Sequence, residues 1–250
     1  MKKVLIVARV EGVAGLTWAN KHLTVEGDMA FAEEINTAAK AIKNCNFQPI
    51  TYAPAGTSAH LKYLDEGIAS VTPNDIYQQI GDIHAVVLVG MPAKSGTQNA
   101  FMDGTFNHVG WRDYAINGRV CGEIAMLKTY FSHFQIPIVF VSGDVAACQE
   151  AKEEIVGVKT VATKRATCRN KAVPIEGAKE QIYETCLQSL QEEIAPSKPL
   201  DLPIRIKISY TRTEYCTDAA TRWYRASATR IDARSLEKTI EDITTISVFS

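Results

Sequence analysis

The sequence lacks the short motifs that identify many metal and nucleotide sites. Its six cysteines form no C-x-x-C pair, which argues against a zinc knuckle or a redox dithiol. We expect these cysteines to be reduced and mostly buried. The chain also has no Walker loop and no G-x-G-x-x-G motif after a strand. The sequence therefore gives no support for nucleotide binding.

An excess of one charge and a long apolar run are also missing. The 250 residues carry a net charge of −1, which argues against nucleic acid and anionic membranes as partners. Basic pairs such as Lys164 and Arg165 are short, and we expect them on a solvated surface. The apolar run at residues 4–8 is too short for a signal sequence or a membrane span. We therefore expect a cytoplasmic protein without a membrane partner.

What the sequence does contain is the pattern of an α/β protein. Hydrophobic residues make up 46% of the chain and charged residues 22%, as in ordinary globular domains. Short β-rich runs alternate with helical patterns, which predicts three αβα layers around a mainly parallel sheet. The strand candidates lie at residues 49–53, 85–89, 138–141 and 158–163. The clearest helical face combines Phe31, Ile35, Ala38, Ala39 and Ile42.

A hairpin and a proline-rich segment organise the rest of the chain. Asn117 and Gly118 tolerate the positive φ angles of a two-residue turn, so residues 114–120 are predicted to form a hairpin. Three prolines between residues 196 and 203 interrupt regular hydrogen bonding. The sequence therefore predicts an α/β domain over residues 1–195, a linker over 196–203 and a small β/α unit over 204–250.

The most informative segment is the turn after the first β-rich run. Residues 9–15 read Arg-Val-Glu-Gly-Val-Ala-Gly. This order of landmarks resembles the DppA-type D-aminopeptidases, zinc enzymes that begin with a strand followed by Asp-x-Glu-Gly-x-x-Gly. The further landmarks that carry the resemblance are Glu33-Glu34, residues 86–90, Ile116-Asn117-Gly118, Gly122-Glu123 and residues 141–144.

The resemblance implies a zinc site with five protein ligands. They are an Asp and a Glu in the first turn, a His after the second strand, a His after the glycine of the third strand, and the Glu of the Gly-Glu pair. Glu11 and Glu123 match this pattern, whereas the other positions hold Arg9, Ala55 and Pro92. None of these three side chains has a lone pair to offer a metal at neutral pH.

The resemblance also implies a catalytic His a few residues before the hairpin. That region reads Asp103, Gly104 and Thr105, without a His. With the ligands and the His replaced, we predict no cofactor, no bound metal and no catalytic residue. Lys94, Asp103 and Thr105 are expected to border the former cleft.

Arg9 is the replacement with the clearest physical consequence. Two carboxylates alone bind zinc poorly, because catalytic sites use three protein ligands and an open position. A guanidinium stays protonated and can balance the charge of a nearby carboxylate. We expect an ion pair with Glu11 or Glu123; the alternative is that Arg9 points into solvent at the end of the strand.

Other residues leave alternatives open. His60 either restores a metal site with Glu11 and Glu123 or is a solvated loop residue. His108 is either a displaced base or a surface histidine. Cys121 is either a nucleophile at a helix N-terminus or a small core residue. Asp144 is expected to cap the helix that follows it.

Together these observations predict a pseudoenzyme. We expect a homo-oligomer that acts as a non-catalytic partner of another protein, in a chaperone-like, scaffolding or fidelity role. The partner would be a biosynthetic enzyme, in amino-acid-derived natural-product (antibiotic) biosynthesis. The alternative is an enzyme with hydrolase or amide-bond chemistry rebuilt in the former cleft around Glu11, Glu123, Asp103 and His60.

Overall fold

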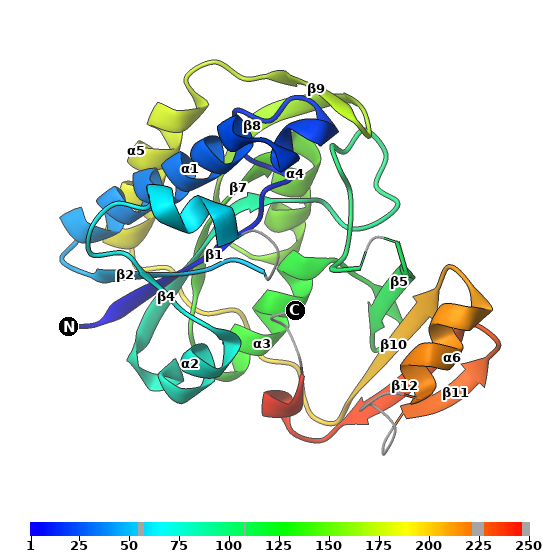
Figure 1. Cartoon of the computed structure of the whole chain (residues 1–250). Helices are drawn as coiled ribbons and strands as arrows, with labels where there is room; N and C mark the ends of the chain where they lie inside the picture. Colours follow the sequence, from blue (N-terminus) through cyan, green and yellow to red (C-terminus); the bar gives the residue numbers. More distant parts are fainter. Residues whose placement is uncertain (55–57, 108, 222–227, 247–250) are drawn as a thin grey trace.

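The computed structural model describes residues 1–54, 58–107, 109–221 and 228–246 (Figure 1). A seven-stranded sheet, ordered β3-β2-β1-β4-β7-β8-β9, forms the centre of the larger part of the molecule. Neighbouring strands are parallel except β9, which runs antiparallel to β8. The strands are β1 (Lys3–Ala8), β2 (Gln48–Tyr52), β3 (Ala69–Ser70), β4 (Ile83–Met91), β7 (Ile138–Asp144), β8 (Lys159–Cys168) and β9 (Lys171–Pro174).

Helices cover both faces of this sheet, which confirms the predicted three-layer α/β fold. One face packs on α1 (Val25–Asn44) and α5 (Ala178–Gln191). The other face packs on α3 (Glu123–His133) and α4 (Val145–Glu154). Shorter helical segments are η1 (Ala19–Leu23), η2 (Ser58–Tyr63), α2 (Pro73–Gln78), η3 (Ile80–Asp82) and η5 (Ile243–Thr245).

Helix α1 shows why the sequence pattern was informative. Its predicted stripe of Phe31, Ile35, Ala38, Ala39 and Ile42 is buried against the sheet, because residues three and four apart share one helix face. Thr24 caps the N-terminus by accepting a hydrogen bond from the backbone N–H of Gly27. The amphipathic helix is confirmed.

A second sheet takes strands from two distant parts of the chain. Its order is β11-β12-β10-β5-β6, and all its pairs are antiparallel. It lies to the right of the main sheet in Figure 1, with α6 (Thr213–Thr221) packed on one face. The strands are β5 (Trp111–Ile116), β6 (Arg119–Val120), β10 (Ile204–Tyr210), β11 (Ala228–Asp232) and β12 (Ser235–Ile240).

This sheet contains the predicted hairpin and qualifies the predicted domain division. Asn117 and Gly118 have φ angles of 51° and 83°, so the two-residue turn between β5 and β6 is confirmed. Residues 196–203 contain no helix or strand. The sheet on their C-terminal side, however, is completed by residues 111–120. The division into 1–195, 196–203 and 204–250 stays a prediction.

Two glycines allow the first turn to lie directly on β4. Gly90 has a φ of 66°, and a Cβ atom there would be 2.1 Å from the carbonyl oxygen of Arg9. A Cβ on Gly12 would be 2.6 Å from the Gly90 carbonyl carbon. Only glycine fits both positions. The turn is fastened by the N–H of Gly12, which donates to the Gly90 carbonyl at 2.7 Å.

The position of β1 determines where a site can form. The chain moves from β1 to β2 on one side and later returns to β4 on the other side. In open α/β sheets, such a switch point opens a crevice at the carboxyl ends of the strands. Arg9 follows β1 and Pro92 follows β4 at this edge.

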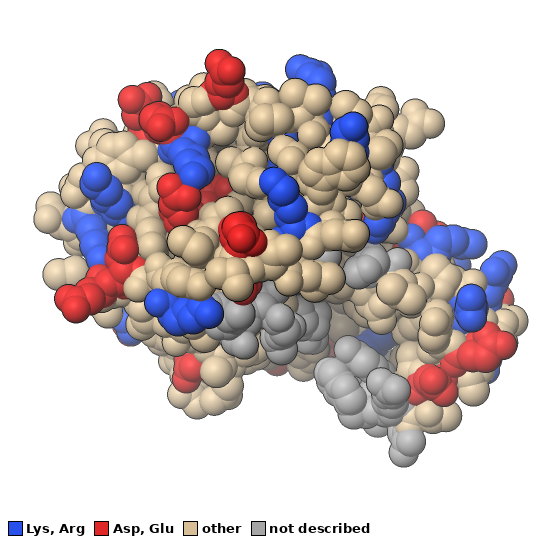
Figure 2. Space-filling view, turned by 45° about the horizontal axis from the view of Figure 1, so that its top comes forward, with Lys and Arg blue, Asp and Glu red and all other residues tan. Residues whose placement is uncertain are grey.

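The face of the molecule seen in Figure 2 shows no large field of one charge. Acidic and basic side chains are interspersed over the face seen in Figure 2. Within the described parts of the chain, no helix is long and apolar enough to cross a membrane.

Candidate functional site

Arg9 and Glu123 form a close ion pair at the carboxyl edge of the main sheet. Arg9 directly follows β1, and Glu123 is the first residue of α3. Arg9 Nε lies 2.5 Å from Glu123 Oε2, and the two side chains are only 10% and 4% exposed. One of the two pairings expected from the sequence is therefore present, and Arg9 does not extend into solvent.

Glu123 depends on Arg9 for its charge balance. Burial raises the pKa of Glu123, and the positive charge of Arg9 opposes this effect, while the negative charge of Glu11 adds to it. The backbone N–H of Phe106 donates to Glu123 Oε1 at 2.7 Å. Arg9 Nε and Glu123 Oε2 therefore form an ion pair between two buried, oppositely charged groups.

Three aromatic rings, those of Phe106, Trp111 and Tyr114, extend in successive contacts from this ion pair. The Phe106 ring lies 5.0 Å from the Arg9 guanidinium carbon, a cation–π distance. Trp111 contacts Phe106 edge-on with ring centroids 6.2 Å apart, and Tyr114 stacks on Trp111 at 5.8 Å. Phe106 has a φ of 49°, which is rare for an aromatic residue. In this conformation its N–H donates to Glu123 and its ring lies against Arg9.

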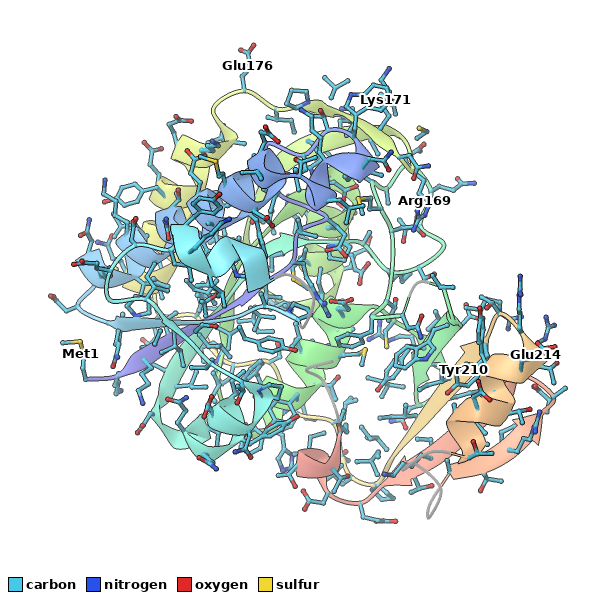
Figure 3. All side chains as sticks on the ribbon, viewed as in Figure 1. Met1, Arg169, Lys171, Glu176, Tyr210 and Glu214 are labelled. Atoms are coloured by element: carbon cyan, nitrogen blue, oxygen red, sulfur yellow. The ribbon has the colours of Figure 1, made fainter. Side chains whose placement is uncertain are left out.

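Asp103 and Thr105, in the region where the family pattern places a catalytic His, make contacts that stabilise the loop around them. Asp103 accepts a hydrogen bond from the N–H of Gly96 at 2.7 Å and forms an ion pair with Arg169 at 3.0 Å. Arg169 lies between β8 and β9, beside this loop (Figure 3). Thr105 Oγ1 accepts from the N–H of Ser95 at 3.2 Å. Asp103 and Thr105 thus make structural contacts at the positions that the sequence assigned to the border of a cleft.

Lys94 is the predicted border residue that does face a cleft. The cleft measures about 600 Å³ and is lined by Lys94, Glu150 and Arg165 among others. The backbone N–H of Lys94 donates to Glu150 Oε2 at 2.7 Å, while Oε1 has no hydrogen-bond partner. Burial raises the pKa of Glu150 to about 7. Sequence reasoning missed Glu150, which lies on an ordinary charged helix.

Lys164 corrects the expectation of a solvated basic pair. Its side chain is fully buried, whereas Arg165 is exposed, because alternate residues of a strand point to opposite faces. Lys164 Nζ donates to the carbonyl oxygens of Glu11 and Leu16 at 2.8 and 2.6 Å. Burial lowers the pKa of Lys164 to about 7, and nearby carboxylates, including that of Glu34, oppose the shift.

Glu34 fixes the first turn from a second direction. Its carboxylate accepts hydrogen bonds from the N–H of Ala14 at 2.9 Å and from the Ser142 hydroxyl at 2.8 Å. The available sequence signal was its position on the buried stripe of α1, between Phe31 and Ile35. Asp144 caps α4 as predicted, by accepting from the N–H of Ala147 at 2.8 Å.

The described residues do not provide the donor set of a zinc site. Among the described residues, no group of three or more His, Cys, Asp or Glu side chains can hold a metal ion. Pro92 is buried and offers no ligand, and Ala55 lies outside the described residues. Glu11 and Glu123 remain, with Arg9 beside them. This donor set supports charge pairing and gives no basis for metal chemistry.

The two histidine alternatives have different outcomes. His60 is buried with its ring 4.6 Å from that of Phe31, and burial lowers its pKa. It is therefore not a solvated loop residue, and it does not join Glu11 and Glu123 in a metal-binding group. His108 lies outside the described residues, so its role stays a prediction.

Cys121 behaves as a small core residue. It is buried, and burial raises the pKa of its thiol to about 11. At neutral pH the thiol therefore stays protonated, whereas a nucleophilic cysteine needs a lowered pKa. The structure places Cys121 in the core, as the core interpretation expects, and gives no support to a nucleophile.

Comparisons with known proteins agree with the family resemblance seen in the sequence. A family model described as D-aminopeptidase matches residues 1–249. A D-aminopeptidase of Bacillus subtilis (strain 168) is 27% identical over 142 residues. That match covers 54% of this chain and 50% of the relative, so it spans about half the length of the relative.

The fold is also similar to a solved structure. It is the Zn-dependent D-aminopeptidase DppA from Bacillus subtilis, a self-compartmentalizing protease, with a TM-score of 0.83 and 18% identity. The match covers 96% of this chain and 92% of the other. At this identity the likeness concerns the fold alone, whereas the family model spans nearly the whole sequence. The chain belongs to the D-aminopeptidase family.

Proposed function

We propose that this protein is a non-catalytic member of the D-aminopeptidase family that acts by binding. The observation that carries the proposal is the ion pair between Arg9 and Glu123. A permanently protonated guanidinium beside a carboxylate opposes the approach of a divalent cation. Arg9 thus supplies the positive charge that a metal would otherwise supply.

The state of the surrounding scaffold supports a binding role. Lys164 and Glu34 hold the first turn through hydrogen bonds that need no metal. A turn that is held by such hydrogen bonds can keep the surfaces around it for partners. The partner that we propose is a biosynthetic enzyme, which this protein would assist as a chaperone, scaffold or fidelity factor in amino-acid-derived natural-product (antibiotic) biosynthesis. This part of the proposal follows from ancestry, since fold alone does not fix function.

The proposed protein is a cytoplasmic homo-oligomer. The solved relative is described as self-compartmentalizing, and soluble oligomers usually form closed symmetric assemblies of identical subunits. All six cysteines are free in the structure, which suits a reducing compartment. Light scattering at micromolar concentration should give the mass of a dimer or a larger assembly. A monomer mass would contradict this part of the proposal.

The competing function, hydrolase or amide-bond chemistry, has less support. Asp103 is engaged by Gly96 and Arg169, and His60 packs on Phe31. Two of the four residues that such chemistry would use therefore have other contacts.

The proposal is tested by pairing an activity assay with a capture experiment. Purified protein should not cleave D-Ala peptides, with or without added zinc, and immobilised protein should retain one biosynthetic enzyme from the source organism. The Arg9→Asp variant provides the matched control, because it restores the acidic residue of the family pattern. Cleavage by the parent protein at a rate typical of enzymes, above about 1 per second, would overturn the proposal.

A further inference from the structure

The start of α1 carries a projecting group of apolar side chains. Leu23, Val25 and Met29 are 79%, 55% and 51% exposed. Val25 and Met29 lie four residues apart on the same face of α1, and Leu23 ends η1 just before it. Residues 23–26 are all exposed, so this segment projects from the protein. Single exposed apolar residues are normal, whereas a contiguous group marks a contact surface. We call Leu23, Val25 and Met29 the apolar knob.

The second sheet contains a groove of matching character. Its lining comes from β5, β10, β11, β12 and the end of η5, and it is mainly apolar, with Trp111, Tyr114, Ile206, Leu236 and Ile240 among its members. The cleft beside Lys94, by contrast, is lined mainly by polar and charged side chains. Burial of apolar surface is favourable and burial of an unpaired charge is costly. This site, which we call the apolar groove, therefore suits an apolar side chain.

The knob cannot enter the groove of its own chain. The segment before α1 lies beside β9, where the backbone of Trp18 forms a bridge with Lys171, at the top of Figure 1. The groove-forming β12 and η5 lie at the bottom of the same view. A projecting surface needs a concave one as its complement. The two surfaces therefore fit a contact in which the knob of one copy meets the groove of another.

Charged residues beside the two surfaces are complementary. Lys21 and Glu26 flank the knob, and both are exposed. Glu237 and Lys238 belong to the lining of the groove. Each surface thus carries one charge of each sign, and a second copy can be oriented with opposite charges facing each other. Such complementarity favours one orientation of a contact over the others.

We propose that Leu23 of one copy inserts into the apolar groove of a second copy, and that this contact joins the subunits of the homo-oligomer. Leu23 is the most exposed residue of the knob, and an aliphatic anchor in a pocket is a suitable centre for an interface. The contact joins two different surfaces, so its repetition gives a ring where the rotation closes. The inference rests on the proposed function, which includes self-assembly.

Two variants test the contact by light scattering at micromolar concentration. Leu23→Glu places a charge on the knob at an exposed position, and Ala228→Phe fills the groove from the edge strand β11. Each should raise the dissociation constant of the assembly at least about tenfold and shift the mass toward that of the monomer. Val156→Glu is the matched control, because this residue is 92% exposed and belongs to neither surface. It should keep the mass of the parent.

A mixture of the two variants identifies the pairing. Leu23→Glu retains the groove and Ala228→Phe retains the knob, so the mixture should form dimers that contain one subunit of each. If Ala228→Phe does not fold, Thr245→Phe replaces it, since Thr245 is an exposed member of the groove. The proposal is overturned if either the knob variant or the folded groove variant keeps the mass of the parent. A mixture that remains monomeric also overturns it.

Failure of this inference can be distinguished from failure of the proposed function. A monomeric parent protein would overturn the homo-oligomer and the knob contact together, whereas an oligomeric parent whose Leu23→Glu variant keeps the same mass would overturn only the knob contact. The competing occupant of the groove is the end of the chain, residues 247–250, which follow Ile246. Unchanged assembly in Leu23→Glu, together with a loss of assembly on truncation after Ile246, would assign the groove to that segment and overturn the proposal.

Discussion

The two sides of the first turn differ in how their polar groups are satisfied. On the side facing the sheet, Lys164 donates to Glu11 and Leu16, and Glu34 accepts from Ala14. On the other side, Arg9 is paired with Glu123 through Nε, and the Glu11 carboxylate makes no hydrogen bond or ion pair with the described residues. On the sheet side, here called the supporting side, these polar groups are hydrogen-bonded. On the other side, here called the open side, Glu11 Oε2 has no hydrogen-bond partner. The hydrogen bonds that shape the turn therefore do not involve the side chains of Arg9 and Glu11.

The largest expected effect comes from removing the charge on the open side. Arg9→Ala leaves Glu123 buried without a counter-charge, which typically costs about 3–5 kcal/mol and lowers Tm by roughly 6–20 °C. Arg9→Asp should be less stable still, because it adds a third negative charge, and it should regain weak zinc binding. Thermal melts with and without zinc measure both effects.

Arg169→Ala is the control for these melts. Arg169 is half-exposed and pairs with Asp103, so its loss should cost about 0–1 kcal/mol. If Arg9→Ala lowers Tm by no more than about 4 °C, the largest shift expected for this control, the two pairs are equivalent and the charge-replacement account fails.

A second substitution tests the supporting side. Lys164→Met preserves the volume but leaves the carbonyl oxygens of Glu11 and Leu16 without their donor, which should cost roughly 2–4 kcal/mol. Zinc should not rescue this variant, because the change lies on the sheet side of the turn. Chemical denaturation measures the loss. Stability equal to that of the parent would show that the turn is held by its glycines alone.

A smaller effect is expected from pH. The pKa of Glu150 is raised from 4.5 to about 7 in the folded protein, so the folded state binds an extra proton between these values. Stability should therefore fall as pH rises from 4.5 to 7, by about 1–3 kcal/mol. Melts of the parent and of Glu150→Gln across this range isolate the effect. Parallel curves for the two proteins would assign the pH dependence to other groups.

The sequence predicted the fold because periodicity reports burial directly. The α1 stripe, the Asn117-Gly118 turn and the Asp144 cap are local patterns with one strong structural solution each. The pairing of β5 with β10 was not predictable, because pairing between strands that lie far apart in the sequence leaves no local signal.

The candidate site was predicted only in part, because some of its residues have a signal in the sequence and others do not. Arg9, Glu11 and Glu123 could be found from their order along the chain, and a pair between Arg9 and one carboxylate followed from charge. Lys164 and Glu150 were missed because a charged residue in a strand or helix is usually exposed. Their burial depends on which face of β8 and of α4 packs against the rest of the protein, and this follows from the order of the strands in the sheet.

The zinc content of the purified protein tests the central claim most directly. The claim is that Arg9 has replaced the metal as the positive charge beside Glu11 and Glu123. Elemental mass spectrometry of protein produced with zinc in the medium should find less than about a tenth of a zinc per chain, because a catalytic site needs three protein ligands. Close to one zinc per chain would contradict the claim and would require ligands that the described residues do not provide.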